Sequence, residues 1–595
     1  MMVTETIDDF DFSEIIKIVK DKEGDRSLSS FKVAFLRNVT LDPIIPYLKY
    51  LFLEEGYKMD IYMGEFNNVL QEVLNTESAL YSYNPNMIIL CLKLEAISER
   101  MTRCFSSMNQ EERNKDIADN LENINLILTR IRENSNSMIL IHNFEAPIHP
   151  CYGVYDYQKR FNQVNTIRNI NFQLVELVNR YDNCFIVDLD LLQSYVGYRN
   201  FIDTRYWHIG KAPYSREALM LIAKEYMKIV RASIGRNRKC LVIDCDNTLW
   251  GGIIGEDGID GIKLGRTYPG SAYLEFQQSI LDLYNRGVIL VISSKNNKED
   301  VLEVLNNHPD MVLRVEHFAI IKADWNDKVS NIKEIADDLN IGLDSMVFVD
   351  DSDFETNMVI EYLPEVKVVT LPKDPTVYRD ILYSYGFFDS LTVSEEDGKR
   401  GKMYKTELGR KRLKSESINL ESYFTSLEME IVIGAPDSFL IPRVAQLTQR
   451  TNQFSLTTKR YLEADVERFV KSDNHEVKYL KLKDRFGDMG LVGVAILEYK
   501  NDTALIDSFL MSCRIIGRRV EDVLLRYCIE CALGRGMQEI YGHYLKTKKN
   551  SQVSNFYQKR GFEVESLSDN EKRYSFSLKN PIMEIPDYFK TIKCI

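Results

Sequence analysis

Two carboxylates stand where a short apolar segment of this chain ends, because the run LVI is followed by Asp244 and then, two residues later, by Asp246. Clustered carboxylates repel one another unless a hard cation neutralises them, and Mg2+ takes oxygen ligands of this kind. Carboxylate, hydroxyl and ammonium groups also occur at three later points, at Ser294, Lys295, Lys328, Asp350 and Asp351. Together these residue types indicate metal-assisted phosphoryl transfer.

Each of these side chains can take a step in that chemistry. With a cation present, Asp244 can attack a phosphorus atom, while the Ser294 hydroxyl and the Lys328 ammonium group hold the phosphoryl oxygens. Asp246 can then protonate the leaving group and later activate water. The pattern is typical of an enzyme that forms a phosphorylated carboxylate.

A parallel sheet must position these residues, because apolar runs of strand length alternate here with amphipathic helix patterns. The runs are residues 240–244, 288–293, 318–322, 346–350 and 366–371. In an open parallel sheet, ligands bind at the carboxyl ends of the strands. We therefore expect the polar residues to meet at one edge of the sheet.

The chain of 595 residues is long enough for several domains, at about 150 residues each. Strand–helix alternation in the first part predicts another doubly wound sheet, and consecutive strands near the end predict an α+β domain. The predicted fold class is α/β, with two doubly wound parallel-sheet (Rossmann-like) domains followed by an α+β domain. The expected segments are 1–235, 236–390, a charged helical linker at 391–425, 426–580 and a tail at 581–595.

Composition narrows the function classes. The net charge is −13 and no long basic block occurs, which argues against a large nucleic-acid interface. The ten cysteines are scattered, which favours a reducing compartment. The N-terminus has no apolar core of a signal peptide, and no run of 18 apolar residues occurs. We expect a cytoplasmic protein with neither nucleic-acid nor membrane partners.

The motifs DCDNT, SK, K and DD, in this order over residues 240–390, resemble the four motifs of the haloacid dehalogenase (HAD) superfamily. The resemblance implies that Asp244 is the nucleophile and Asp246 the general acid and base. It implies phosphate ligands at Thr248, Ser294, Lys295 and Lys328, and Mg2+ ligands at Asp244, Asp246, Asp350 and Asp351. The alternative is a Rossmann-like sheet with acidic loop ends.

The spacing between the first two motifs leaves room for a glycine-rich flap, WGGIIGEDG, and one helix. This spacing predicts that no cap domain is inserted there. A site without a cap is open, so we expect either a macromolecular substrate or closure by another domain.

The stretches DCDNTLWGG, SKNN, DSMVFVDDSDFE, RVAQLTQRTNQFSLTT and DRFGDMGLVGV together resemble FkbH-like proteins, over nearly the whole chain. The resemblance implies a HAD domain followed by an acetyltransferase-like domain. It further implies a small acyl phosphate substrate, 1,3-bisphosphoglycerate. Its glyceryl group would be loaded as a thioester on the phosphopantetheine arm of an acyl carrier protein.

Cys245 lies between the two leading carboxylates and has two interpretations. A thiol beside the phosphate site could attack the acyl carbonyl and carry the glyceryl group. Alternation along a strand instead turns Cys245 away from Asp244 and Asp246, as a buried residue under the sheet.

The segments CRIIGRRVEDVLLRY and NFYQKRGF resemble the GCN5-related N-acetyltransferase (GNAT) fold. The resemblance implies that Arg514 and Gly517 lead into a helix N-terminus that grips a coenzyme A pyrophosphate, and that Tyr557 is a general acid toward the thiolate. Arg519 replaces a small residue of the family pattern, and would either obstruct coenzyme A or bind the phosphate of a carrier's arm. The alternative is that Arg518 and Arg519 are solvated charges at the helix start.

The first domain resembles SGNH hydrolases in outline, with Asn143 after a strand and with Asp203 and His208 near its end. The nucleophile motif is absent, because the chain reads LRNVTLDP and offers Asn38 and Thr40 instead of a serine. We therefore interpret His208 as a structural histidine, and the domain as a degenerate scaffold or docking module.

Three functions follow from these patterns. The favoured one is a Mg2+-dependent glyceryl transferase and phosphatase with an acyl carrier protein as acceptor. The second is a stand-alone phosphatase acting on a small phosphomonoester. The third is an N-acyltransferase of polysaccharide or sugar modification that uses the C-terminal domain and coenzyme A.

Overall fold

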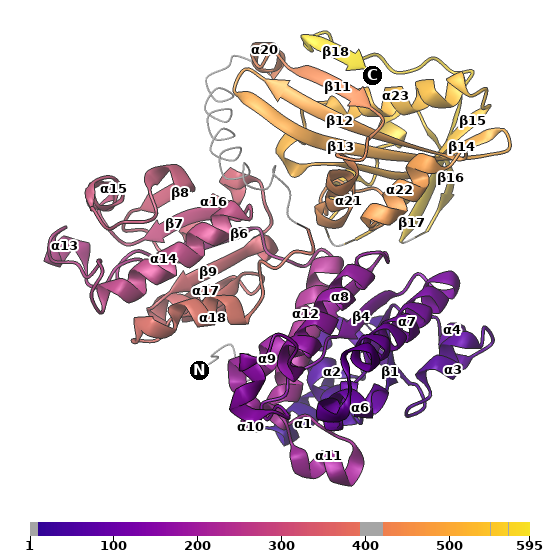
Figure 1. Cartoon of the computed structure of the whole chain (residues 1–595). Coiled ribbons are helices and arrows are strands. Elements are labelled where there is room, and N and C mark those ends of the chain that lie inside the picture. Colours follow the sequence, from indigo (N-terminus) through magenta and orange to yellow (C-terminus); the bar gives the residue numbers. More distant parts are fainter. Residues whose placement is uncertain (1–6, 8–9, 26, 393–419, 548, 569) are drawn as a thin grey trace. The chain divides into compact units, whose positions relative to one another are not determined.

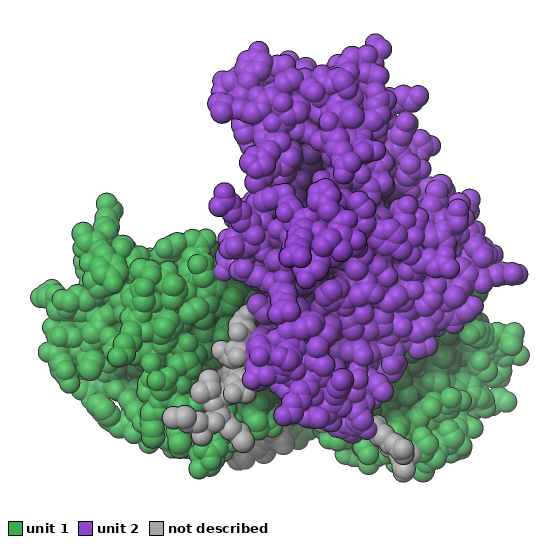
Figure 2. Space-filling model, turned by 90° about the horizontal axis from the view of Figure 1, so that it is seen from below, with its two compact units in different colours: residues 1–4, 231–595 green, residues 5–230 purple. Residues whose placement is uncertain are grey.

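The computed structural model describes residues 7, 10–25, 27–392, 420–547, 549–568 and 570–595 (Figure 1). Residues 5–230 form one compact unit, and residues 231–595 make up most of the other (Figure 2). The described strands form three separate sheets of five, five and eight strands. The predicted fold class, two parallel α/β sheets followed by an α+β domain, is confirmed.

The first sheet has the strand order β2-β1-β3-β4-β5, and all its pairs are parallel. The strands are β1 (Ser29–Arg37), β2 (Tyr57–Met63), β3 (Met87–Cys91), β4 (Met138–His142) and β5 (Cys184–Val187). The helices are α1 (Phe12–Lys22), α2 (Ile45–Glu54), α3 (Val69–Leu74), α4 (Ala79–Tyr83), α5 (Leu94–Ile97), α6 (Glu99–Arg103), α7 (Gln110–Asn134), α8 (Gln163–Val178), α9 (Leu189–Val196), α10 (Tyr198–Phe201), α11 (Thr204–Gly210) and α12 (Arg216–Ser233). The order turns back between β1 and β3, so the carboxyl ends of these two strands form the crevice of this sheet.

The second sheet has the order β10-β9-β6-β7-β8 and is also parallel throughout. Its strands are β6 (Cys240–Ile243), β7 (Ile289–Ser294), β8 (Phe318–Ala323), β9 (Met346–Asp350) and β10 (Lys367–Thr370). Its helices are α13 (Ile254–Asp257), α14 (Gly270–Asn285), α15 (Lys298–Asn307), α16 (Lys328–Leu339), α17 (Asp353–Tyr362) and α18 (Tyr378–Ser384).

The central strand β6 is buried on both faces, which explains why its sequence is apolar throughout. Leu241 and Ile243 pack with residues of α14, α15 and α18 on one face. Cys240 and Val242 pack with residues of α16 and α17 on the other. Both faces are thus closed by helices, and a ligand can reach β6 only at a strand end.

The third sheet has the order β16-β17-β15-β14-β13-β12-β11-β18. Its strands are β11 (Glu430–Gly434), β12 (His475–Asp484), β13 (Gly487–Lys500), β14 (Thr503–Met511), β15 (Glu539–Leu545), β16 (Glu563–Leu567), β17 (Glu571–Ser577) and β18 (Thr591–Cys594). The helices are α20 (Leu420–Ser426), α21 (Ile441–Arg450), α22 (Glu463–Lys471) and α23 (Val520–Gly534). Neighbouring strands from β11 to β14 are antiparallel, whereas β14 and β15 are parallel.

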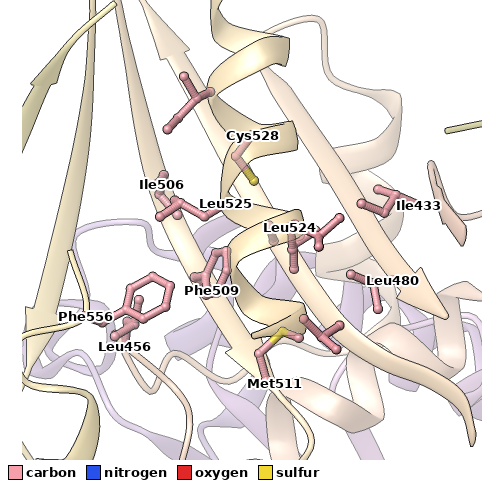
Figure 3. Close-up of a cluster of buried hydrophobic side chains, with 14 of the residues drawn as sticks. Ile433, Leu456, Leu480, Ile506, Phe509, Met511, Leu524, Leu525, Cys528 and Phe556 are labelled. Carbon is pink, nitrogen blue, oxygen red and sulfur yellow. The ribbon is translucent and has the colours of Figure 1, made fainter. Parts of the chain in front are cut away.

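The core of this domain lies between the sheet and α23 (Figure 3). Leu524, Leu525 and Cys528 of α23 pack in one cluster with Ile506 and Phe509 of β14. Cys528 is fully buried and fills space as a small apolar side chain.

The structure describes all of the predicted tail and little of the predicted linker. The tail, residues 581–595, contains β18, which pairs in parallel with β11. The pairing occurs because β11 would otherwise be an edge strand with unpaired main-chain groups. Most of the predicted linker at 391–425 lies outside the described residues. Within the described part of the chain, no helix is both long and apolar enough to cross a membrane.

Candidate active site

Three carboxylates meet at the carboxyl edge of the second sheet. Asp244 directly follows β6, and Asp350 and Asp351 lie at the end of β9, which is its neighbour. The register Ile243↔Val349 brings the two strand ends level. One oxygen of each carboxylate lies within 4.8 Å of the others. The predicted convergence of these residues is present in the structure.

Lys328 is the cation closest to this group in the described contacts. It is the first residue of α16, and its side chain is 4% exposed. Its Nζ donates to Asp244 Oδ1 at 2.6 Å and also to Asp350 Oδ2. Burial disfavours the charged ammonium group, but the two carboxylates outweigh burial, so the pKa of Lys328 is raised. The buried lysine therefore remains charged and bridges two carboxylates.

One ammonium group does not neutralise the three carboxylates, of which Asp244 and Asp350 are buried. Burial, followed by the charge of Asp244, raises the pKa of Asp350 to about 7. The same two causes raise the pKa of Asp351 to about 6. Burial and mutual repulsion thus disfavour the ionised form of these carboxylates. Such an arrangement is expected of oxygen ligands that bind a divalent cation.

Asp246 is separated from these three carboxylates and is held by other donors. Its Oδ1 accepts from Trp250 Nε1 at 2.9 Å and from the Ile254 main-chain N–H at 3.1 Å. Its Oδ2 accepts from Asn296 Nδ2 at 3.0 Å. Burial raises the pKa of Asp246, against these hydrogen bonds. Asp246 is not among the three carboxylates that meet here, and donors from the flap and from the loop after β7 bond to both of its oxygens, so its role as a metal ligand stays a prediction.

The predicted phosphate-binding residues divide into two groups. Ser294 is buried at the end of β7, and Thr248 Oγ1 donates to Asp351 Oδ1 at 3.5 Å, so both lie at the site. Lys295 instead forms an ion pair with Glu355 of α17 at 2.6 Å, with its side chain 36% exposed. The assignment of Lys295 as a phosphate ligand therefore stays a prediction, and the structure adds that its ammonium group also pairs with Glu355.

Asn296 and Asn247 were not predicted as site residues, although they lie in the stretches SKNN and DCDNTLWGG. Asn296 is buried, and its Nδ2 donates to Ser294 Oγ at 3.0 Å as well as to Asp246. Asn247 has a φ of 52°, and its side chain accepts from the Gly252 N–H at 2.9 Å. Asparagine tolerates this left-handed backbone. The signal was the polar amide after a strand end, which can bridge two catalytic groups.

Cys245 is fully buried and continues the alternation of Leu241 and Ile243. It packs with Leu249 and Trp250 in the cluster beneath the sheet. Burial, followed by the charge of Asp244, raises the pKa of the Cys245 thiol well above its ordinary value. A buried neutral thiol is a poor nucleophile. The structure favours the interpretation of Cys245 as a core residue over that of an acyl carrier.

The C-terminal residues singled out by sequence surround the start of α23. Gly517 and Arg519 have φ values of 83° and 59°, and Arg519 Nε donates to Asp522 Oδ2 at 2.8 Å. Arg518 is 4% exposed and pairs with Asp484 at 3.4 Å. Arg514 is also buried, and its Nε donates to Ser512 Oγ at 3.2 Å. The interpretation of Arg518 as a solvated charge is wrong, because its guanidinium group is buried against an aspartate.

Tyr557 lies inside the core and not at a surface. Its side chain is 1% exposed, and its ring packs against Phe556 and Phe562. Its hydroxyl forms no hydrogen bond with any described residue. Burial raises the pKa of Tyr557 well above its ordinary value. This environment does not support the expected role as a proton donor to a thiolate.

Of the three SGNH-like residues, Asn143 and Asp203 bond to helix starts, and His208 is exposed. Asn143 Oδ1 accepts from the Leu189 N–H at 2.7 Å, at the start of α9. Asp203 is the N-cap of α11 and accepts from the Tyr206 N–H at 3.0 Å, whereas His208 is exposed on that helix. No hydrogen bond or ion pair joins the three side chains in the described part of the chain. Capping explains Asn143 and Asp203 without any catalytic role.

The carboxylates, the buried lysine and the strand-end serine, on a five-stranded parallel sheet, define an α/β enzyme of the HAD type. The FkbH N-terminal domain family matches residues 32–231 of the chain. The N-terminal part of the protein BF1531 from Bacteroides fragilis, which contains a phosphatase domain and is complexed with Mg, is 30% identical in sequence. The match covers 64% of this chain and 100% of that one, with a TM-score of 0.59. The chain belongs to the FkbH-like family.

Two acetyltransferase structures each match about a quarter of the chain. The ribosomal-protein-S18-alanine N-acetyltransferase from Escherichia coli is 13% identical, over 26% of this chain and 97% of that one, with a TM-score of 0.20. A spermidine N-acetyltransferase SpeG mutant from Vibrio cholerae is 15% identical, over 25% and 95%, with a TM-score of 0.21. Similarity at this level carries no information about activity. No curated protein matches the chain.

Proposed function

We propose that this chain is a Mg2+-dependent phosphatase of the HAD type, with Asp244 as the nucleophile. The observation that carries the proposal is the meeting of Asp244, Asp350 and Asp351 within 4.8 Å, with Lys328 bonded to two of them. A binding module would not need a carboxylate nucleophile, a buried cation and a second, separately held carboxylate at one strand edge. The FkbH-like relative that contains a phosphatase domain supports the same conclusion.

The residues present fit Mg2+. Asp244, Asp350 and Asp351 would hold the ion, because they offer three carboxylate oxygens close together and Mg2+ selects hard oxygen ligands. When bound, the ion would neutralise the carboxylates and draw charge from a phosphoryl group. Burial and the charge of Asp244 raise the pKa values of Asp350 and Asp351, and a bound cation would counter both effects.

The residues of the chain perform the remaining steps. A carboxylate oxygen of Asp244 attacks phosphorus and the ester oxygen leaves, forming an aspartyl phosphate. Asp246, whose pKa is raised by burial, protonates the departing oxygen. It then takes a proton from the water that attacks the aspartyl phosphate, which returns Asp244 and releases inorganic phosphate. Lys328 and Ser294 hold the phosphoryl oxygens through both steps.

The finer part of the proposal concerns the substrate and acceptor, and rests on the FkbH-like family. The substrate is 1,3-bisphosphoglycerate, and the acceptor is the phosphopantetheine thiol of an acyl carrier protein. The thiol attacks the acyl carbonyl and expels phosphate, forming a glyceryl thioester, while the HAD site hydrolyses the phosphate ester at the other end. Because Cys245 is buried, the carrier thiol is the acceptor in this scheme.

The second candidate is a phosphatase that acts on a small phosphomonoester without a carrier. The burial of Cys245 favours this candidate over a scheme in which the Cys245 thiol relays the acyl group. The two candidates share the HAD chemistry and differ only in acyl transfer.

One experiment tests both candidates. The protein is incubated with Mg2+, freshly generated 1,3-bisphosphoglycerate and a phosphopantetheinylated carrier protein, and phosphate release and carrier mass are followed. We expect release of the ester phosphate to be abolished by Asp244→Asn, whereas the acyl phosphate group is still lost, and we expect a glyceryl increment on the carrier with the wild-type protein. The control variant is Asp324→Asn, because Asp324 follows β8 at the same sheet edge, but its side chain accepts only from Asn326 and Asn331 in the described contacts.

The outcomes separate the candidates. Asp244-dependent phosphate release without a carrier increment would establish the stand-alone phosphatase. If Asp244→Asn and Asp324→Asn released the ester phosphate equally, Asp244 would not be the nucleophile and the phosphatase proposal would fail.

A further inference from the structure

The sheet of the C-terminal domain splits between two of its strands. β14 and β15 are paired in parallel over Thr503–Ile506 and Glu539–Gly542, and the pairing then stops. β14 nevertheless continues to Met511 and β15 to Leu545. Diverging strands leave unpaired N–H and C=O groups facing each other, and such edges bind an extended chain or ligand arm by main-chain hydrogen bonds. The split is thus a slot lined by main-chain hydrogen-bond donors and acceptors.

Residues 453–457, called the slot segment below, already occupy it. The Leu456 N–H donates to Phe509 O at 3.1 Å, and the Met511 N–H donates to Phe454 O at 2.9 Å, both across to β14. On the other side, the Leu545 N–H of β15 donates to Leu456 O at 2.8 Å. The segment therefore satisfies main-chain groups of both diverging strands.

Side chains fill the rest of the split. Phe454 is 3% exposed and Leu456 is fully buried, in the same cluster as Phe509 and Phe556. Figure 3 shows Leu456 beside Phe556 in this cluster. Asn550, also fully buried, donates its Nδ2 to Ser455 O at 2.9 Å. The slot segment is held by the core and by its main chain together.

At the start of α23, two carboxylates of the helix itself lie beside the main-chain N–H groups that could bind a phosphate. Glu521 and Asp522 lie in the first turn of this 15-residue helix, and both are buried. Asp522 accepts from Arg519 Nε at 2.8 Å and from Arg560 Nε at 2.6 Å. Two buried carboxylates complement the partial positive charge of the helix N-terminus. They also offset the positive charge of Arg519 and Arg560, which leaves this terminus less attractive to a phosphate or pyrophosphate.

We propose that the slot segment is a permanent internal strand, and that the C-terminal domain of this chain takes no thioester cofactor with a pantetheine arm. The arm would need the main-chain groups of β14 that Phe454 and Leu456 already use, and its phosphates would meet Glu521 and Asp522. The motif TNQFSLT is thereby explained as part of the sheet. This inference does not depend on the phosphatase activity, and it excludes coenzyme A-dependent N-acyl transfer.

The first test is a calorimetric titration of the full-length protein with acetyl-coenzyme A and, separately, with coenzyme A. We expect no saturable heat up to about 1 mM ligand. Saturable binding with one site per chain would overturn the proposal. Slow hydrogen exchange in the α23 peptides of the same preparation shows that the C-terminal domain is folded, and phosphatase activity is measured separately, so failure of either proposal is visible by itself.

The second test is hydrogen exchange followed by mass spectrometry. Peptides that contain Leu456, Met511 and Leu545 should exchange at least about 100-fold more slowly than unstructured chain, because their amides bridge the split. Phe454→Ala should speed this exchange about tenfold or more. The control Phe439→Ala, at a side chain that is 90% exposed, should leave it unchanged.

Fast exchange at these amides in the wild-type chain would contradict a permanent strand. Equal exchange in Phe454→Ala and Phe439→Ala would show that the core does not hold the segment, and would also overturn the proposal. If Phe454→Ala does not fold, the wild-type exchange and the titration still decide.

Discussion

At the scale of single residues, the site depends on a buried balance of charge. Lys328 lies between Asp244 and Asp350, and all three side chains are at most 9% exposed. Removing one partner of a buried ion pair leaves an uncompensated charge, which costs more than the pair itself contributes. The lysine thus both holds the nucleophile and permits the carboxylates to be buried.

Lys328→Met tests this balance. Without Mg2+ the substitution should lower the free energy of unfolding by about 3 kcal/mol, because two buried carboxylates lose their counter-ion. Denaturant unfolding followed by tryptophan fluorescence measures the change, since Trp250 and Trp325 lie in this domain. Lys298→Met, at an exposed position at the start of α15, is the control. Equal stability of the two variants would contradict a buried ion pair.

At the scale of elements, strands and helices create environments that their sequences do not show. His142 ends β4 and is buried against α12, where its Nε2 bonds to the Tyr226 hydroxyl. Burial lowers the pKa of His142 to about 4, with Glu145 opposing and Lys93 adding to the shift. The histidine is therefore neutral in the folded domain.

Acid should destabilise the first sheet through this histidine. The pKa of His142 is about 4 when folded and 6.5 when unfolded, so between these values the unfolded chain binds more protons. Stability therefore falls as pH falls from 6.5 towards 4, by about 1.4 kcal/mol for each pH unit. Urea titrations at several pH values, read by hydrogen exchange in β4 peptides, measure the slope.

A histidine on the surface is the matched comparison. His142→Phe should flatten the slope, whereas His208→Phe, at an exposed position on α11, should retain it. An unchanged slope in His142→Phe would assign the acid sensitivity to other groups.

Gly542 shows how closely β15 approaches the segment that follows it. A Cβ at this position would lie 2.5 Å from Tyr557 Cζ. Gly542→Ala should therefore destabilise the C-terminal domain by about 1–3 kcal/mol, through overpacking of the ring. Thermal unfolding measures the effect. Gly534→Ala, where a Cβ meets nothing within 4 Å, should be neutral or slightly stabilising. Similar melting temperatures for both variants would contradict this packing.

At the scale of the whole molecule, two compact units separate the first sheet from the HAD sheet. Ligands of one sheet should therefore stabilise that sheet alone. The proposed cation site lies only on strands β6 and β9. Binding of a cation at this site should therefore stabilise the HAD sheet and leave the first sheet unchanged.

Mg2+ should slow hydrogen exchange in peptides that contain Asp244 and Asp350, and leave peptides of β1 to β5 unchanged. At 100 times its dissociation constant, the ion should stabilise the HAD sheet by about 2.7 kcal/mol. Asp351→Asn should weaken this effect, and Asp324→Asn should retain it. Uniform slowing across both units, or no slowing at all, would argue against a site at this edge.

The sequence was sufficient for the strands of both parallel sheets and for the edge where the site forms. Apolar runs and helix periodicity are local properties, and polar residues at strand ends converge because parallel strands end together. Asp244, Ser294, Lys328 and Asp350 were found in this way. The ion pair of Lys295 could not be predicted, since its partner Glu355 lies 60 residues further along the chain.

Only the tertiary structure decided which reactive groups are accessible. Cys245 and Tyr557 are chemically suited to catalysis, but each is buried in a hydrophobic cluster beside a sheet. Arg518 meets Asp484, and Leu456 enters the split between β14 and β15, through contacts between distant parts of the chain. Sequence determines which groups a chain offers and the strand ends at which they stand. Burial and long-range pairing depend on how all elements pack together, and they decide which groups can act.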